Sequence, residues 1–398
     1  MKPGPGKTLA GKHLPMNRRN LAIDIFRGLT MVLMIAVNDF WSVDGVPHFL
    51  EHFDTLEDGM GLSDFVYPMF LFAMGMSIPF AIDRRREKGV ADGRILGHIL
   101  SRTFALLVMG AFIVNTEVPM AGNKGVYWLL MLAGFFLVWN VYPKDFSAAK
   151  WLKLAGAAIL AVLAVTYRTP EGGLFTASWW GILGQIGWMY LFCATAYLLS
   201  NGRDLIPAAL WAALCIINLS VAPMRDGSQL VGPNFAADLP AALNLGNGHS
   251  AILALGGLLT VLAERRLKRN RVAAGLGAAA ILALLAFATH QGWIISKGLG
   301  TLPWCLYATA ASVALYTLLR VMEKHGLTGW FKPFEPAGTA TLTVYMIPYF
   351  FLALWVFVNP AVPAWLCGWL GVLKCLLFSF LCVAVAWGLK ALGIKLKI

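Results

Sequence analysis

The chain is built mainly from uninterrupted apolar runs of roughly 18–22 residues, separated by short polar turns. A helix needs about 20 such residues to cross roughly 30 Å of hydrocarbon at 1.5 Å per residue. A transmembrane β-barrel would show shorter segments in which apolar and polar residues alternate. The runs therefore predict an all-α fold: a polytopic integral membrane helical bundle.

Composition supports this, because 59% of the residues are hydrophobic and only 13% are charged. Globular chains are about 45–50% apolar and about 25% charged. Windows of about twenty residues predict about twelve transmembrane helices, and ten or eleven if the weakly separated fourth and fifth spans or the last two are merged. The predicted spans are 23–43, 64–82, 98–115, 125–143, 150–167, 179–200, 204–222, 249–264, 272–290, 300–320, 339–358 and 368–390.

The 32 Lys and Arg residues cluster in every second loop. The clusters are Arg18-Arg19, Arg84–Arg86 with Lys88, Lys144 with Lys150 and Lys153, Arg265–Arg271, and Lys390 with Lys395 and Lys397. The other loops hold only Lys124, Arg168, Arg225 and Lys297. Basic loops stay in the cytoplasm, so both termini are predicted to be cytoplasmic. The positive-inside pattern of membrane insertion accounts for the net charge of +12. We therefore predict that the basic loops face a lipid bilayer and that the chain does not bind nucleic acid.

This topology divides the chain into a cytoplasmic tail (1–22), a transmembrane domain (23–392) and a second tail (393–398). Two outer loops, 44–63 and 223–248, are long for a bundle of tight hairpins, and long loops tend to carry function. All six cysteines lie in apolar segments, with no disulfide framework and no zinc-ligand spacing. No tightly bound metal is predicted.

The first outer loop concentrates polar residues. Seven of the 20 carboxylates lie between residues 39 and 64: Asp39, Asp44, Glu51, Asp54, Glu57, Asp58 and Asp64. Asn38 ends the first span and Asp64 begins the second, so the hairpin should bring both toward His52. Polar groups at this depth are costly unless they face a wet cavity. The alternative is that the acids cap helices and form a solvated loop.

Histidine suits a general base because its pKa, ordinarily about 6.5, lets it take and release a proton near neutral pH. Asn38 would orient a carbonyl or the imidazole, and Asp64 would fix the tautomer of His52 or bind an amine. Asp39 and Lys297 are the predicted substrate contacts. A helix cap is the alternative for Asp39, and snorkelling to the interface is the alternative for Lys297.

At the inner end of the first span, Asp24 and Arg27 lie three apart on one helical face. A local ion pair is the simpler interpretation. Alternatively, Arg27, Arg102 and the run 84–86 would hold a phosphorylated cytoplasmic donor, because guanidinium groups bind phosphates bidentately.

Several segments resemble the heparan-α-glucosaminide N-acetyltransferase family and its bacterial relatives. The specific part is the first hairpin, which comprises residues 20–38, His52 and residues 63–78. Weaker similarities follow in the expected order at 180–187, 296–301 and 337–345. The interval 53–61 is longer and more acidic than in the usual family pattern, and residue 185 is Gln where many relatives have Arg.

The resemblance implies transfer of an acetyl group from cytoplasmic acetyl-CoA to glucosamine, another amino sugar or a cell-envelope glycan on the outer side of a bacterial inner membrane. It implies that His52 is the catalytic residue and that Asn38 assists. It leaves open whether the acetyl group first rests on the histidine or passes directly to the amine. The resemblance also leaves open whether the chain forms a homodimer.

The first rival is a secondary transporter for a small sugar-like solute. A transporter should show matching halves and charges at mid-membrane, whereas the polar residues here gather at helix ends. A second rival is a membrane O-acyltransferase family whose first span ends in His, while this one ends in Asn38-Asp39. A non-catalytic scaffold would leave the acid-rich loop unexplained.

Overall fold

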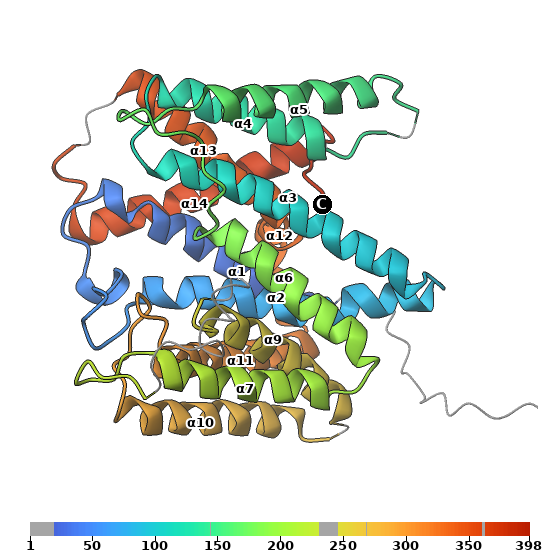
Figure 1. Cartoon of the computed structure of the whole chain (residues 1–398), viewed down its shortest axis with the longest axis vertical. Helices are drawn as coiled ribbons and strands as arrows, with labels where there is room; N and C mark the ends of the chain where they lie inside the picture. Colours follow the sequence, from blue (N-terminus) through green and yellow to red (C-terminus); the bar gives the residue numbers. More distant parts are fainter. Residues whose placement is uncertain (1–19, 144, 231–245, 268, 360–362) are drawn as a thin grey trace, which may run out of the picture.

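The computed structural model describes residues 20–143, 145–230, 246–267, 269–359 and 363–398. Parts of the predicted tail 1–22 and loop 223–248, and Lys144 and Lys268 of the basic clusters, lie outside these ranges. The described residues form an all-α structure of 13 α-helices (Figure 1). The helices are α1 (Leu21–Asn38), α2 (Leu62–Glu87), α3 (Asp92–Glu117), α4 (Lys124–Trp139), α5 (Ala149–Thr166), α6 (Ile182–Ser200), α7 (Leu205–Val221), α9 (His249–Arg266), α10 (Arg271–His290), α11 (Leu302–Lys324), α12 (Glu335–Thr339), α13 (Thr341–Val358) and α14 (Gly368–Ala391).

Nine of these helices are long and apolar enough to cross a membrane, by length and composition within the described residues. The chain is therefore a polytopic membrane protein, as predicted. Helices also stand at the three remaining predicted spans, but α4 and α7 are shorter, and α9 carries Glu264, Arg265 and Arg266 in its last turn. The total of twelve spans remains a prediction.

The helices stack in layers from α4 and α5, through α3, α13, α14 and α1, to α2, α9, α11 and finally α7 and α10 (Figure 1). Burial follows this order. Of the residues in its apolar window, 72% are buried in α1 and 67% in α2, against 17% in α5 and 11% in α10. The central helices therefore form the protein core, and the peripheral ones present their side chains outward.

The centre is held by a close contact between α2 and α9. A Cβ atom at Gly75 would lie 1.8 Å from the carbonyl oxygen of Ala254, and one at Gly257 would lie 2.0 Å from that of Phe72. Only glycine allows backbones to approach so closely, and small residues serve this purpose between membrane helices. Each helix thus contributes one glycine to the contact, and together the two glycines hold α2 tightly against α9.

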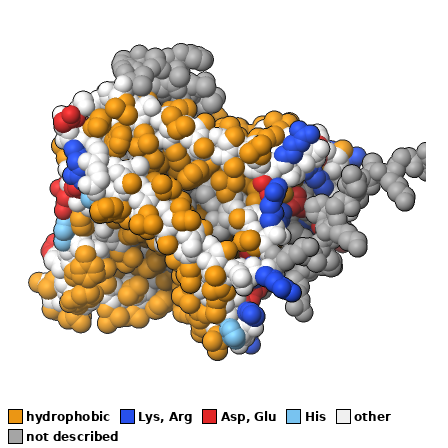
Figure 2. Space-filling model, turned by 90° about the horizontal axis from the view of Figure 1, so that it is seen from below, with side chains coloured by type: hydrophobic (Ala, Val, Ile, Leu, Met, Phe, Trp, Pro, Cys, Tyr) orange, Lys and Arg blue, Asp and Glu red, His pale blue; other side chains and the backbone are white. Residues whose placement is uncertain are grey.

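The periphery carries a broad apolar surface. Figure 2 shows hydrophobic side chains across one face, with charged side chains gathered at the two ends. On α10 the exposed side chains include Val272, Leu276, Ile281, Leu284 and Phe287. An apolar belt between polar rims is the pattern of a surface that contacts lipid.

Successive long helices reverse direction, so the loops gather at two ends of the bundle (Figure 1). One end, called the His52 end here, holds the loops 39–61, 222–230 and 291–301. The opposite end, called the arginine end, holds the start of α1, the α2–α3 turn and α12. There the 3₁₀ helix η3 (Gly329–Phe334) and α12 cover α1, with Gly338 against the carbonyl of Asp24.

Candidate active site

The 39–61 loop leaves α1 at Asn38 and returns to α2 through two short 3₁₀ helices, η1 (Phe40–Ser42) and η2 (His48–Leu50). Asp64, in the first turn of α2, caps its own helix: its Oδ2 atom accepts hydrogen bonds from the backbone N–H groups of Gly61 and Phe53, both at 3.1 Å. A carboxylate is favoured at a helix N-terminus. This capping leaves Oδ1 free to face His52.

His52, Asp64 and Lys297 converge at the His52 end. The Nδ1 atom of His52 lies 2.7 Å from Oδ1 of Asp64, and Nζ of Lys297 lies 3.7 Å from the same oxygen. The Asp64 side chain is buried, whereas that of His52 is half exposed. An ionised carboxylate only accepts hydrogen bonds, so Nδ1 donates and Nε2 keeps its lone pair. The arrangement leaves an accessible basic nitrogen beside a buried, oriented carboxylate.

Lys297 approaches the imidazole directly, with Nζ at 3.0 Å from Nδ1 and 3.4 Å from Nε2 of His52. Because Nδ1 carries the proton, Nε2 is the atom to which the lysine can donate. Burial lowers the pKa of Lys297, and the Asp64 carboxylate opposes this only in part. The site therefore holds an amine whose protonated form is less favoured than that of an ordinary lysine.

The 291–301 loop positions Lys297 by direct contacts with the 39–61 loop. Ser296 donates its hydroxyl to the carbonyl of Thr55 at 2.6 Å, and the N–H of Gly59 donates to the carbonyl of Ile295 at 3.0 Å. At Gly298 a Cβ atom would lie 2.4 Å from the Thr55 hydroxyl oxygen. A side chain there would separate the two loops, so this glycine is needed for their contact.

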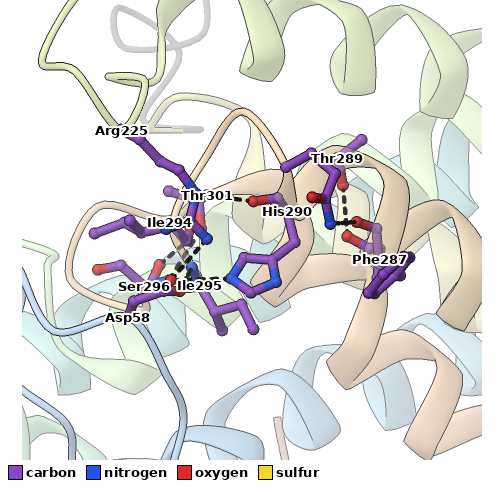
Figure 3. Close-up of polar contacts among 11 residues, drawn as sticks. Asp58, Arg225, Phe287, Thr289, His290, Ile294, Ile295, Ser296 and Thr301 are labelled. Carbon is purple, nitrogen blue, oxygen red and sulfur yellow. Dashed lines mark hydrogen bonds and ion pairs between the residues drawn. The ribbon is translucent and has the colours of Figure 1, made fainter.

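A second cluster ties three loops together (Figure 3). The Asp58 carboxylate accepts hydrogen bonds from Nε2 of His290 at 2.8 Å and from the N–H of Ile295 at 2.8 Å, and it pairs with Arg225 at 2.7 Å. Arg225 also donates to the carbonyl of His290 at 3.0 Å. We call Asp58, Arg225 and His290 the Asp58 clasp. Burial raises the pKa of Asp58, but the hydrogen bonds from Ile295, His290 and Arg225 outweigh it, so the net shift is downward.

Below Asp64, buried polar side chains continue into the bundle. Trp304 donates its indole N–H to the carbonyl of Asp64 at 3.2 Å and stacks on Tyr67. The Tyr67 hydroxyl lies 2.7 Å from that of Ser250, which donates to Oε1 of Gln185 at 3.4 Å. The chain of contacts joins α2, α11, α9 and α6, starting from the residue that pairs with His52.

The two residues at the end of α1 are placed differently from this cluster. Asn38 is exposed, and among the described residues its side chain forms no hydrogen bond. Asp39 pairs with Lys374 of α14 at 2.7 Å and accepts a hydrogen bond from Ser42 at 3.3 Å. Lys374 also donates to the Ser42 hydroxyl at 2.6 Å. Asp39 thus fastens α1 to α14.

At the arginine end, Arg27 pairs with Asp24 one turn earlier in α1. This is the local ion pair that was the simpler interpretation of the sequence. Arg102 of α3 lies with its guanidinium carbon 4.6 Å from the ring centre of Tyr190, and no carboxylate within the described residues forms an ion pair with it. The charges of Arg27 and Arg85 repel it, and its Nε atom is buried without a hydrogen-bond partner. Positive charge therefore accumulates here.

Comparison with known proteins matches residues 19–186 to the profile described as heparan-alpha-glucosaminide N-acetyltransferase, catalytic. Residues 19–186 are therefore similar to the catalytic part of this family. The Mus musculus protein named heparan-alpha-glucosaminide N-acetyltransferase is 28% identical over 163 residues, which cover 35% of this chain and 24% of that protein. The Homo sapiens protein of the same name is 33% identical over 98 residues, which cover 24% of this chain and 13% of that protein. The matches thus span a quarter or less of the relatives' length.

The match to the heparan-alpha-glucosaminide N-acetyltransferase family contains His52 and Asp64, the predicted pair that the structure brings together, and also Asn38, Arg27 and Arg102. Lys297 lies beyond it, as do Arg225 and His290. The sequence predicted Lys297 as a substrate contact, as one of few basic residues in the outer loops, but it did not predict the contact with His52. It gave no signal for the Asp58 clasp, because nothing local links residues 58, 225 and 290.

Proposed function

We propose that this chain is a transmembrane acyltransferase that moves an acetyl group from cytoplasmic acetyl-CoA to an amino sugar or a cell-envelope glycan on the other side of the membrane. The observation that carries the proposal is the contact between His52 and Asp64, 2.7 Å from Nδ1 to Oδ1, with Nε2 left basic. The named activity of the family is N-acetyl transfer, and the matched segment includes this pair.

The proposed reaction joins an acceptor amine to an acetyl thioester. The nitrogen lone pair attacks the carbonyl carbon, the carbon–sulfur bond breaks, and CoA leaves as the thiolate, which then takes up the proton that the amine has given to His52. Nε2 of His52 takes the proton that the amine loses, while Asp64 holds the ring and stabilises the imidazolium. A route through an acetylated His52 needs the same free nitrogen, so both routes use this geometry.

Lys297 and Asn38 are the proposed polar groups around the reacting carbonyl. The ammonium of Lys297 lies 3.4 Å from Nε2, where it would stabilise developing negative charge on oxygen. The exposed amide of Asn38 is available to orient the acetyl group. Asp39 stays a predicted acceptor contact, and any such contact has to compete with Lys374.

Arg102 and Arg27 are the proposed donor contacts at the arginine end. A phosphate-bearing nucleotide would supply the negative charge that Arg102 lacks within the described residues, and its guanidinium offers several N–H donors. The basic clusters support a cytoplasmic location for this end in the proposed topology, with 23–392 as the proposed transmembrane domain. A bacterial inner membrane is the proposed location.

The test uses the full chain in proteoliposomes, with acetyl-labelled acetyl-CoA on one side and glucosamine on the other. We expect labelled N-acetylglucosamine on the glucosamine side, measured by mass spectrometry. Passage of unmodified glucosamine without any acetylated product would support the transporter instead. Protein-free liposomes give the background leak and the uncatalysed reaction.

A further inference from the structure

We infer that Lys297 is itself an acetylation site of this chain, modified at its own active site when no acceptor amine is present. The inference rests on the proposed function, because it uses the same donor and the same base. The inference adds a self-modification: the fraction of chains acetylated at Lys297 would depend on how much acceptor amine is available.

The geometry that carries the inference is the position of the lysine amine. An acceptor amine must come within hydrogen-bond reach of the imidazole for His52 to take its proton. Nζ of Lys297 already lies 3.4 Å from Nε2 and 3.0 Å from Nδ1. An acetyl group delivered to this place meets the lysine as its nearest primary amine among the described residues that contact His52.

The chemistry balances without another reactant. The Nζ lone pair attacks the thioester carbonyl, the carbon–sulfur bond breaks, and CoA leaves as the thiolate, which the imidazolium of His52 then protonates. Nε2 of His52 accepts the proton from Nζ, and the product is an amide on Lys297. Burial also lowers the pKa of this lysine, which increases the fraction present as the nucleophilic free amine.

Acetylation would change the site that performs it. The amide carries no charge, so Asp64 would lose the cation now 3.7 Å from Oδ1, and the acetyl group would occupy space beside the imidazole. We therefore expect the modified chain to transfer acetyl groups more slowly. An acceptor that fills the site would protect the lysine.

Lys374 provides a matched internal control. It also lies at the His52 end and is similarly exposed, with 27% of its side chain accessible against 30% for Lys297. Its ammonium is bound by Asp39 at 2.7 Å and Ser42 at 2.6 Å, and no histidine contacts it among the residues described. Uncatalysed acetylation depends only on how much free amine each lysine carries, whereas the inferred reaction should select Lys297 in a way that requires His52.

The experiment incubates the reconstituted full chain with isotope-labelled acetyl-CoA, without glucosamine, and quantifies acetylated peptides by mass spectrometry over time. We expect Lys297 to be acetylated about 100-fold faster than Lys374, since a positioned base typically contributes this much. Added glucosamine should slow the labelling of Lys297 but not that of Lys374. The His52→Gln variant, which keeps a polar side chain in the loop, should lose the difference between the two lysines.

Equal labelling of Lys297 and Lys374, or selective labelling that survives in both His52→Gln and His52→Ala, would overturn the inference. Parallel measurement of N-acetylglucosamine separates the two proposals. If glucosamine is acetylated while Lys297 is not selected, only the self-modification fails. If neither is acetylated, the proposed function fails with it.

Discussion

The surroundings of His52 and of Arg102 differ in how charge is balanced. At the His52 end, Asp64 is matched by His52 and Lys297, and Asp58 is matched by Arg225 and His290. Arg102 has an aromatic ring and two other arginines as neighbours, with no carboxylate paired to it among the described residues. Balanced charges hold groups in place, whereas an unbalanced cation gains most from an anionic ligand. This difference fits the proposed roles, with positioning and proton transfer at the His52 end and donor binding at the arginine end.

The largest predicted effect is at His52. His52→Ala should lower the rate of acetyl transfer by about 10²–10⁴-fold, the usual contribution of a general base, and leave the KM for acetyl-CoA unchanged. Steady-state kinetics in proteoliposomes measures both. His48→Ala is the matched control, because His48 lies in the same loop and bonds to Glu57 at 2.8 Å instead of Asp64. Equal losses in both variants would show that the loop matters but not the imidazole of His52.

The next effect should appear at Arg102. Arg102→Met keeps the apolar stem and removes the charge, so the KM for acetyl-CoA should rise about 10–100-fold with little change in kcat, as expected for losing hydrogen bonds to a phosphate. Arg94→Met is the control, since Arg94 is an exposed residue in the first turn of the same helix, α3. A fall in kcat at unchanged KM would break the division between the two ends.

A smaller effect is expected at the Asp58 clasp. Asp58→Asn should lower the transfer rate severalfold, because partly exposed ion pairs contribute about 1 kcal/mol or less. The folded-state pKa of Asp58 is below the ordinary value of about 3.9, so its stabilisation is full above that value and is lost as the pH falls through the lower folded pKa. Hydrogen exchange of the 291–301 loop at pH 3 and pH 7 measures this. Asp54→Asn is the control, because Asp54 lies in the same 39–61 loop as Asp58.

The smallest effect concerns His48 itself. The hydrogen bond that His48 donates to the Glu57 carboxylate raises the pKa of His48 above the ordinary value of about 6.5. A raised pKa means that the pair stabilises the loop fully below pH 6.5 and less as the pH rises through the folded pKa. His48→Ala should therefore leave transfer within about twofold of the parent and change loop exchange only at low pH. A larger change at high pH would contradict this sign.

The fold was predictable to the extent that apolar run length decides it. The run 272–290 predicts α10, and the helix is Arg271–His290. The short α12 was not predicted, because it is fixed by Gly338 packing on the Asp24 carbonyl and not by a periodic pattern. Length and polarity therefore identify helices long enough to cross a membrane, and they miss a short helix that depends on tertiary contacts.

The candidate site was predictable where its residues are close in the sequence. His52 and Asp64 are 12 residues apart and were expected to meet in one hairpin. Lys297 comes from 245 residues away, so its contact with His52 depends on loop packing that no local pattern specifies. The pairing of Asp39 with Lys374 was missed for the same reason. The one available hint was that two opposite charges, Asp39 and Lys374, lie within predicted spans.

The interlocked glycines of α2 and α9 also limit how this protein can move. With Gly75 seated on the Ala254 carbonyl and Gly257 on that of Phe72, neither helix can slide past the other without a backbone collision. Asp64 and Ser250, one on each helix, must then travel as parts of a single rigid body. Any motion that admits a bulky acceptor has to come from the loops above this unit or from the helices around it.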